Sequence, residues 1–107
     1  MFRLNTALVA GSVLESIGAA AAHGAASHIV GHRGRQFSES KMSISVGDTI
    51  IFKNDDDVDH DVVVDRTSIH TGTMEPGEEC AVSFDRTGLY RARCRLHPQM
   101  KLTILVK

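Results

Sequence analysis

The sequence lacks the features that mark several common functional classes. It has no uninterrupted apolar run long enough to cross a bilayer, so we expect no membrane span. Twelve basic and 13 acidic residues give a net charge of −1, which leaves no excess charge to attract nucleic acid or an anionic membrane. With only two cysteines, the chain has no paired Cys-x-x-Cys knuckles and no closing histidine pair, which argues against a zinc finger. Partner choice must therefore rest on local surface patches.

The N-terminal residues have the three-part pattern of a secretory signal peptide. Arg3 lies near the start, an apolar stretch with few polar residues runs from Leu4 to Leu14, and small residues follow at Ala19 to Ala22. Glu15 weakens the pattern because it puts a charge next to the apolar stretch. A short N-terminal helix on a cytosolic protein is the alternative.

We therefore expect a signal-type helical segment over residues 1–22, with cleavage after Ala22 or as late as Ala26. Residues 27–107 would form one soluble domain, periplasmic or otherwise exported. A domain of this size buries little apolar surface, so a bound metal would help to stabilise it.

Downstream of the alanine-rich stretch, apolar and polar residues alternate with the period of two that is typical of β-strands. Turn signals such as Gly47-Asp48 and Pro76-Gly77 separate the alternating runs, and no amphipathic helix pattern follows residue 30. The sequence thus predicts an all-β fold, a Greek-key β-sandwich or barrel of seven to eight strands. The clearest expected strands are Lys41–Val46, Thr49–Lys53, His60–Val64, Cys80–Phe84, Tyr90–Arg95 and Lys101–Lys107.

Four residues provide the ligand set of a blue-copper electron-transfer centre. Cys94, His97 and Met100 lie within seven residues near the C-terminus, and His60 lies upstream in an acidic loop. Because arginines at 91, 93 and 95 share one strand face, Cys94 must point to the opposite, inner face. Thiolate and thioether suit Cu(I), whereas imidazole suits both oxidation states. We therefore predict one copper ion, alternating between Cu(I) and Cu(II), and the transfer of one electron.

At these residues the chain resembles the cupredoxins, or blue copper proteins, and among them the amicyanin- and plastocyanin-like periplasmic proteins. The resemblance covers roughly residues 36–107. The short loop from Cys94 to Met100 is most similar to that of amicyanin. The other matching segments are Val46–Thr49 with Phe52, the Asn54-x5-His60 spacing, the turn Glu75–Glu78, and Gly88-x-Tyr90-x3-Cys94.

The resemblance implies a role for each matching position. His60, Cys94 and His97 would form a trigonal plane around the metal, and Met100 would be the long axial ligand. Asn54 would support the site from outside the ligands, its amide tying the His60 loop to the backbone near Cys94.

The residues on either side of His60 depart from the family pattern. The family commonly has proline before this histidine and asparagine after it, whereas this chain has Asp59 and Asp61. Extra negative charge close to the metal favours the oxidised state. We therefore predict that these two carboxylates, when ionised, give the centre a low reduction potential, and that Asp61→Asn raises it.

Cys80 leaves two readings of the site open. A disulfide between Cys80 and Cys94 would abolish the thiolate ligand and leave a metal-free, stapled structural sandwich. Against this, Cys80 is in phase with Val82 and Phe84, where a buried thiol packs as an apolar residue.

Two other functional classes are alternatives to an electron carrier. A copper chaperone or sequestration protein would use the same ligands as an electron carrier. An enzyme is not expected, because a copper oxidase or reductase needs a further catalytic copper and no second ligand cluster is present.

We expect a monomer that meets redox protein partners transiently through the exposed edge of His97, between Leu96 and Pro98. The arginine row at 91, 93 and 95 and an acidic rim over Asp55–Asp61 are two charged zones that could steer such a partner. The remaining histidines are expected at the surface: His23, His28, His32 and His70.

Overall fold

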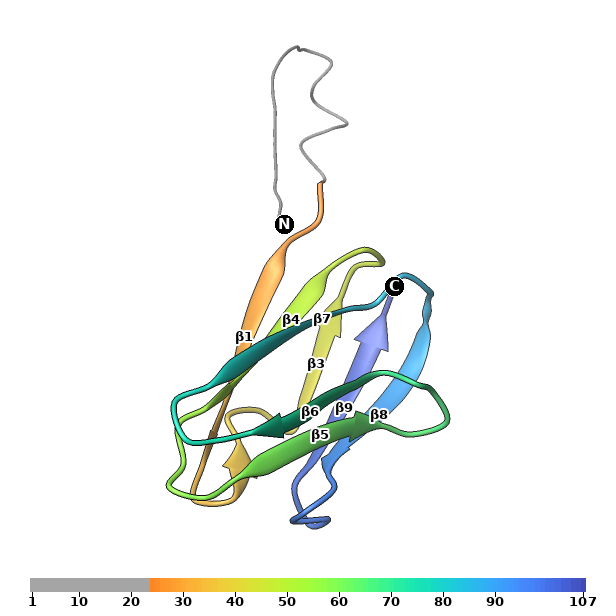
Figure 1. Cartoon of the computed structure of the whole chain (residues 1–107). Coiled ribbons are helices and arrows are strands. Elements are labelled where there is room, and N and C mark those ends of the chain that lie inside the picture. Colours follow the sequence, from red (N-terminus) through yellow and green to blue (C-terminus); the bar gives the residue numbers. More distant parts are fainter. Residues whose placement is uncertain (1–23) are drawn as a thin grey trace.

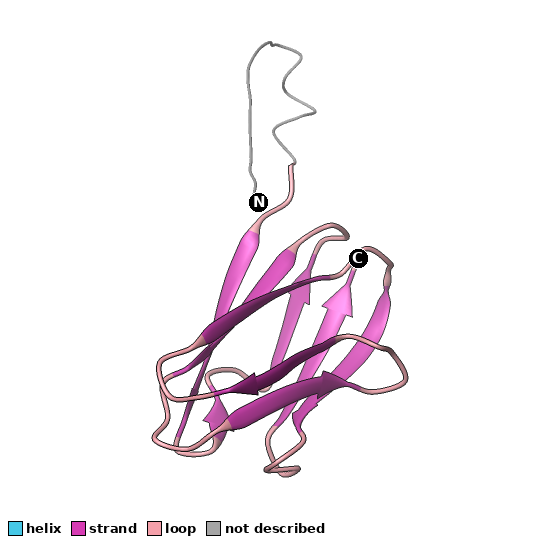
Figure 2. Ribbon diagram, viewed as in Figure 1, coloured by secondary structure: helices cyan, strands magenta, loops and turns pink. Residues whose placement is uncertain are grey.

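The alternating pattern is realised as nine strands in a computed structural model that describes residues 24–107 (Figures 1 and 2). The expected signal segment over residues 1–22 lies outside the described residues. Within them, no helix is long and apolar enough to cross a membrane. The strands are β1 (Ser27–Arg33), β2 (Gln36–Phe37), β3 (Lys41–Ile44), β4 (Thr49–Asn54), β5 (His60–Val64), β6 (His70–Met74), β7 (Glu79–Ser83), β8 (Gly88–Cys94) and β9 (Lys101–Val106).

The strands form two sheets that face each other across one core. One sheet has the order β2-β1-β4-β7 and the other the order β3-β9-β8-β5-β6. The pairs β1·β4 and β3·β9 are parallel, so the chain crosses between the sheets, as it does in Greek-key sandwiches. The predicted all-β sandwich is confirmed, with nine strands rather than seven or eight. The two-residue β2 is too short to show any periodicity in the sequence.

The core consists of the inward-facing residues of both sheets. Phe52 and Phe84 are its largest side chains, and both are almost fully buried. In β9, Leu102, Ile104 and Val106 are buried while the residues between them are more exposed, as the alternation predicts. The other members of the core are Val30, Ile44, Ile50, Val62, Val64, Met74, Val82 and Ala92.

A buried carboxylate anchors the start of β1 to the rest of the sandwich. Asp48 accepts hydrogen bonds from the backbone N–H groups of Ala26 and Ser45, and its Oδ2 lies 2.9 Å from His28 Nε2. The Ala26 bond, then the His28 and Ser45 bonds, lower the pKa of Asp48 to about 2. His28 therefore has a structural partner and is not a free surface histidine.

Candidate metal centre

Three predicted ligands converge at the end of the sandwich that holds the β8–β9 loop, opposite the C-terminus (Figure 1). The donor atoms of His60, Cys94 and His97 all lie within 4.8 Å of one another. Cys94 Sγ is 3.4 Å from His60 Nδ1 and 3.8 Å from His97 Nδ1. His60 and Cys94 are fully buried, whereas His97 is half-buried. The group is thus closed on the protein side and open to solvent only along His97.

Strand pairing brings these residues together from distant parts of the sequence. His60 is the first residue of β5 and Cys94 the last of β8, and these antiparallel neighbours pair Val62 with Cys94. The starting end of one strand therefore meets the finishing end of the other. The backbone N–H of Arg95 donates to the carbonyl of Asp61 at 2.7 Å and prolongs the pairing beyond Cys94.

Backbone hydrogen bonds close the Cys94–Met100 loop tightly. The N–H of Cys94 donates to the carbonyl of Met100, and the N–H of Met100 donates to the carbonyl of His97. Met100 is 2% exposed and directly precedes β9, so it returns to the side of the sandwich where Cys94 lies. The spacing of two residues between successive ligands is what permits this closure.

The spacing of the donor atoms fits a metal ion. In a first-row divalent site such as zinc, metal–sulfur bonds of about 2.3 Å and metal–nitrogen bonds of about 2.0 Å separate the two ligand atoms by about 3.7 Å at an angle of about 120°. The two sulfur–nitrogen separations of 3.4 and 3.8 Å bracket this value. A thiolate with two imidazoles suits copper, and so does a methionine whose backbone is bonded to Cys94 and His97. No disulfide removes the thiolate, because both Cys80 and Cys94 are free.

Asn54 supports the site from the opposite sheet. Its amide nitrogen donates to the carbonyls of Val58 and Met74, both at 2.9 Å, and its oxygen accepts from the N–H of Asp56. The expected tie to the His60 loop is therefore present through Val58. The second hydrogen bond goes to Met74 of β6, which pairs with His60 of β5, and not to the backbone near Cys94.

Asp61 is buried beside the centre, but its charge is compensated. One carboxylate oxygen lies 2.6 Å from Arg95 Nη2 and 3.0 Å from Arg95 Nε. The other oxygen is buried and has no hydrogen-bond partner. Arg95 thus offsets much of the negative charge that the sequence placed next to His60.

Sequence reasoning missed Asp56, whose Oδ2 lies 3.0 Å from His60 Nε2. The same oxygen accepts the backbone N–H of Arg35, and Oδ1 accepts that of Asp57. The Arg35 bond contributes most to holding the pKa of this carboxyl below its usual range. In the sequence, Asp56 is one of several acidic residues in a loop, and nothing distinguishes it from its neighbours.

The expectation that His32 lies at the surface is wrong. Its ring is fully buried, packs edge-on against His60 with 5.1 Å between ring centroids, and has no hydrogen-bond partner on either nitrogen. Burial, and then the nearby His60, lower the pKa of His32 to about 4. The signal was the period-two phase of β1, which puts His32 on the same face as buried Val30.

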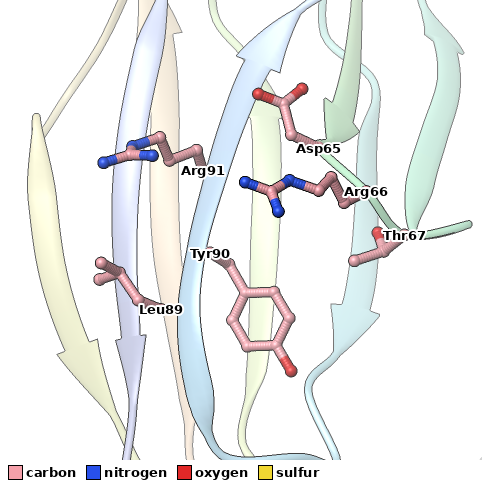
Figure 3. A pocket seen from close by; sticks show the side chains of 6 residues that line it. All are labelled: Asp65, Arg66, Thr67, Leu89, Tyr90 and Arg91. Atoms are coloured by element: carbon pink, nitrogen blue, oxygen red, sulfur yellow. The ribbon is translucent and has the colours of Figure 1, made fainter.

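A surface hollow of about 270 Å³ lies outside this centre (Figure 3). It is formed by the turn after β5 and the first part of β8, at the ends of these strands opposite His60 and Cys94. None of the predicted ligands takes part. Its lining residues are Asp65, Arg66, Thr67, Leu89, Tyr90 and Arg91.

Known proteins share both the fold and the sequence pattern of this chain. The family model described as copper binding proteins, plastocyanin/azurin family, matches residues 26–107. Plastocyanin from Vicia faba is 32% identical over 77 residues, which cover 60% of this chain and 78% of that protein. Amicyanin from Paracoccus versutus superposes with a TM-score of 0.69 at 22% identity, covering 76% of this chain and 81% of that one. A Cu-containing nitrite reductase from Thermus scotoductus gives a TM-score of 0.69 at 29% identity over 75% of this chain, but this chain spans only 22% of that protein.

Proposed function

The chain belongs to the plastocyanin/azurin family of copper-binding proteins, and we propose that it acts as a one-electron carrier. The observation that supports this most directly is the convergence of one thiol and two imidazoles within 4.8 Å, with no second such cluster among residues 24–107. A thiolate with two imidazoles suits reversible one-electron chemistry at copper. Membership of this family also supports the expectation that the chain is not an enzyme.

We infer that His60, Cys94, His97 and Met100 would hold the copper ion. Bound copper supplies the change between Cu(I) and Cu(II). The protein supplies ligands whose positions are held by two strands and a closed loop, so they move little when the charge of the metal changes. Little ligand movement makes electron exchange fast.

The route for the electron is the edge of His97. This side chain is half-buried, while its neighbours Leu96 and Pro98 are exposed, Leu96 by 47%. A small apolar rim around a partly accessible ligand suits the weak, brief contacts of redox partners. The acidic rim contributes exposed carboxylates at Asp57 and Asp59 on the same end of the sandwich.

Copper delivery is the second candidate, since it uses the same ligands. The complete burial of His60 and Cys94 favours retention of the metal, because an acceptor could approach it only from the side of His97. Mixing the copper form with an apo acceptor distinguishes the two functions. A carrier exchanges electrons in milliseconds and keeps its copper, whereas a delivery protein loses it to the acceptor.

Addition of Cu(II) to the purified domain tests the proposal. We expect an intense visible thiolate-to-copper band and a paramagnetic resonance spectrum with a narrow copper hyperfine splitting. Cys94→Ser is the matched control, since it replaces sulfur by oxygen at nearly constant size. A band of equal intensity in Cys94→Ser, or no band in the wild type, contradicts the proposal.

For location, we propose export with cleavage upstream of Ala26. The backbone of Ala26 donates to Asp48 and accepts from Thr49, so cleavage after Ala22 keeps both bonds and cleavage after Ala26 removes them. Intact mass spectrometry of the protein from a periplasmic extract tests this. A mature chain that begins at Ser27, or a chain that stays in the cytoplasm with residue 1 intact, refutes it.

A further inference from the structure

The two ring nitrogens of His60 face two different partners. Nδ1 lies 3.4 Å from Cys94 Sγ, and Nε2 lies 3.0 Å from Asp56 Oδ2. A neutral imidazole carries one proton, and a carboxylate can only accept a hydrogen bond. The contact with Asp56 therefore places the proton on Nε2 and leaves the lone pair of Nδ1 directed toward the Cys94 thiol.

Asp56 is itself fixed by backbone groups. Its side chain is only 7% exposed and accepts N–H groups from Arg35 at 2.8 Å and from Asp57 at 2.9 Å. Arg35 and Gly34 form the two-residue turn between β1 and β2, with φ angles of 56° and 60°. Two successive residues with positive φ are typical of a type I′ hairpin turn. This turn directs the Arg35 N–H toward the carboxylate.

The buried ring of His32 limits the rotation of His60. The two rings meet at 88° with 5.1 Å between centroids, and neither nitrogen of His32 has a hydrogen-bond partner. His32 therefore does not compete for the Nε2 proton of His60. His32 packs against one side of the His60 ring, and Asp56 holds the Nε2 edge of the same ring.

We propose that Asp56 is a positioning residue for the copper centre, which selects the His60 tautomer that ligates through Nδ1 and raises the electron density on that ring. This inference rests on the proposed function and deepens it. A carboxylate bonded to the outer nitrogen of a ligand histidine increases the basicity of the ligand and favours the higher oxidation state of the metal. Among the carboxylates near the site, Asp61 is largely offset by Arg95, so Asp56 has the stronger effect on the metal.

The first test uses the apoprotein and nitrogen-15 NMR of the histidine rings. We expect the Nε2-protonated form of His60 to dominate in the wild type, and its ratio to the Nδ1-protonated form to fall at least tenfold in Asp56→Asn. Asp59→Asn is the matched control, because it removes an equal charge from an exposed residue next to His60. A wild-type His60 protonated on Nδ1 overturns the inference, and this measurement stands even if Asp56→Asn does not fold.

The second test uses the copper-loaded protein. Loss of a partner of this kind typically costs ten- to a hundredfold in metal affinity. We expect Asp56→Asn to lower the affinity for Cu(II) relative to Cu(I) about tenfold, which is a rise in reduction potential of about 59 mV for one electron. Asp59→Asn should shift the potential by less than a third of this. Equal shifts in the two variants refute a role through His60. A wild type that binds no copper refutes the proposed function, while the NMR result still decides the role of Asp56.

Discussion

Replacing Asn54 by alanine is the most informative test of how the two sheets hold the centre. The side chain is fully buried and makes three hydrogen bonds, to the carbonyls of Val58 and Met74 and from the N–H of Asp56. A typical protein hydrogen bond contributes about 1 kcal/mol net, so the three bonds together contribute about 3 kcal/mol. The truncation leaves three backbone groups short of a partner, and the small cavity adds to the loss.

The expected loss is large for a domain of this size, whose total stability is about 5–10 kcal/mol. Urea unfolding of the apoprotein, followed by circular dichroism, measures it directly as a lower midpoint at an unchanged slope. In a thermal scan the same loss lowers the melting temperature by about 12–24 °C.

Two further variants show whether the amide is the cause. Asn54→Asp keeps the acceptor for Asp56 but removes both donors, so it should also destabilise the apoprotein strongly. Ser83→Ala removes one exposed hydroxyl that contacts Thr49, and should change stability by less than about 0.5 kcal/mol. If Asn54→Ala costs less than about 1 kcal/mol, the amide does not clamp the sheets and the reasoning fails.

Three other outcomes follow from the contacts above. Arg95→Met leaves the buried carboxylate of Asp61 without its hydrogen-bond donor and should destabilise the protein by about 1–3 kcal/mol. Arg95→Met combined with Asp61→Asn should recover most of this loss in urea unfolding. Because the folded-state pKa of Asp48 is lowered to about 2, its contribution is present above its unfolded value of 3.8 and is lost as pH falls toward 2. Unfolding free energies between pH 5 and 2 should therefore fall less steeply in Asp48→Asn. Cys80→Ala should leave the visible band of the copper form unchanged, and loss of the band would show that Cys80 takes part in the site.

Most of the fold and the ligand positions could be predicted because they depend on the alternation and spacing of residues that are close in the sequence. Period-two alternation located β3, β4, β5, β7, β8 and β9, but neither β1 nor β6 was among the expected strands. The short spacing from Cys94 to Met100 required a closed loop. The family resemblance is confirmed by the match over residues 26–107. The two-residue β2 has no periodicity, so only the structure shows that its turn faces the loop before His60.

The residues around the ligands were harder to predict, because their roles depend on contacts between distant segments. Asp61 looked decisive because it adjoins His60 in sequence, yet it lies against Arg95 after the strands pair. Asp56 looked like one more solvated carboxylate, yet the β1–β2 turn holds it against His60. Sequence distance to a ligand therefore does not show which side chain contacts it, since β-sheet register decides what each side chain meets.

One sheet carries the proposed ligands and the other carries the groups that restrain His60, so the stability of the packing between the sheets affects the geometry of the ligands. All four proposed ligands belong to β5, β8 or the loop after β8, which lie in one sheet or at its end. The groups that restrain His60 come from the other sheet: His32 from β1, and Asn54 from β4 with the Asp56 loop that follows it. Substitutions that loosen the packing between the sheets at this end should therefore make the position of the His60 ring more variable, even where no ligand is changed. Equal loosening at the far end, near Tyr90 and its bond to the Arg86 carbonyl, should lower stability and leave the site intact.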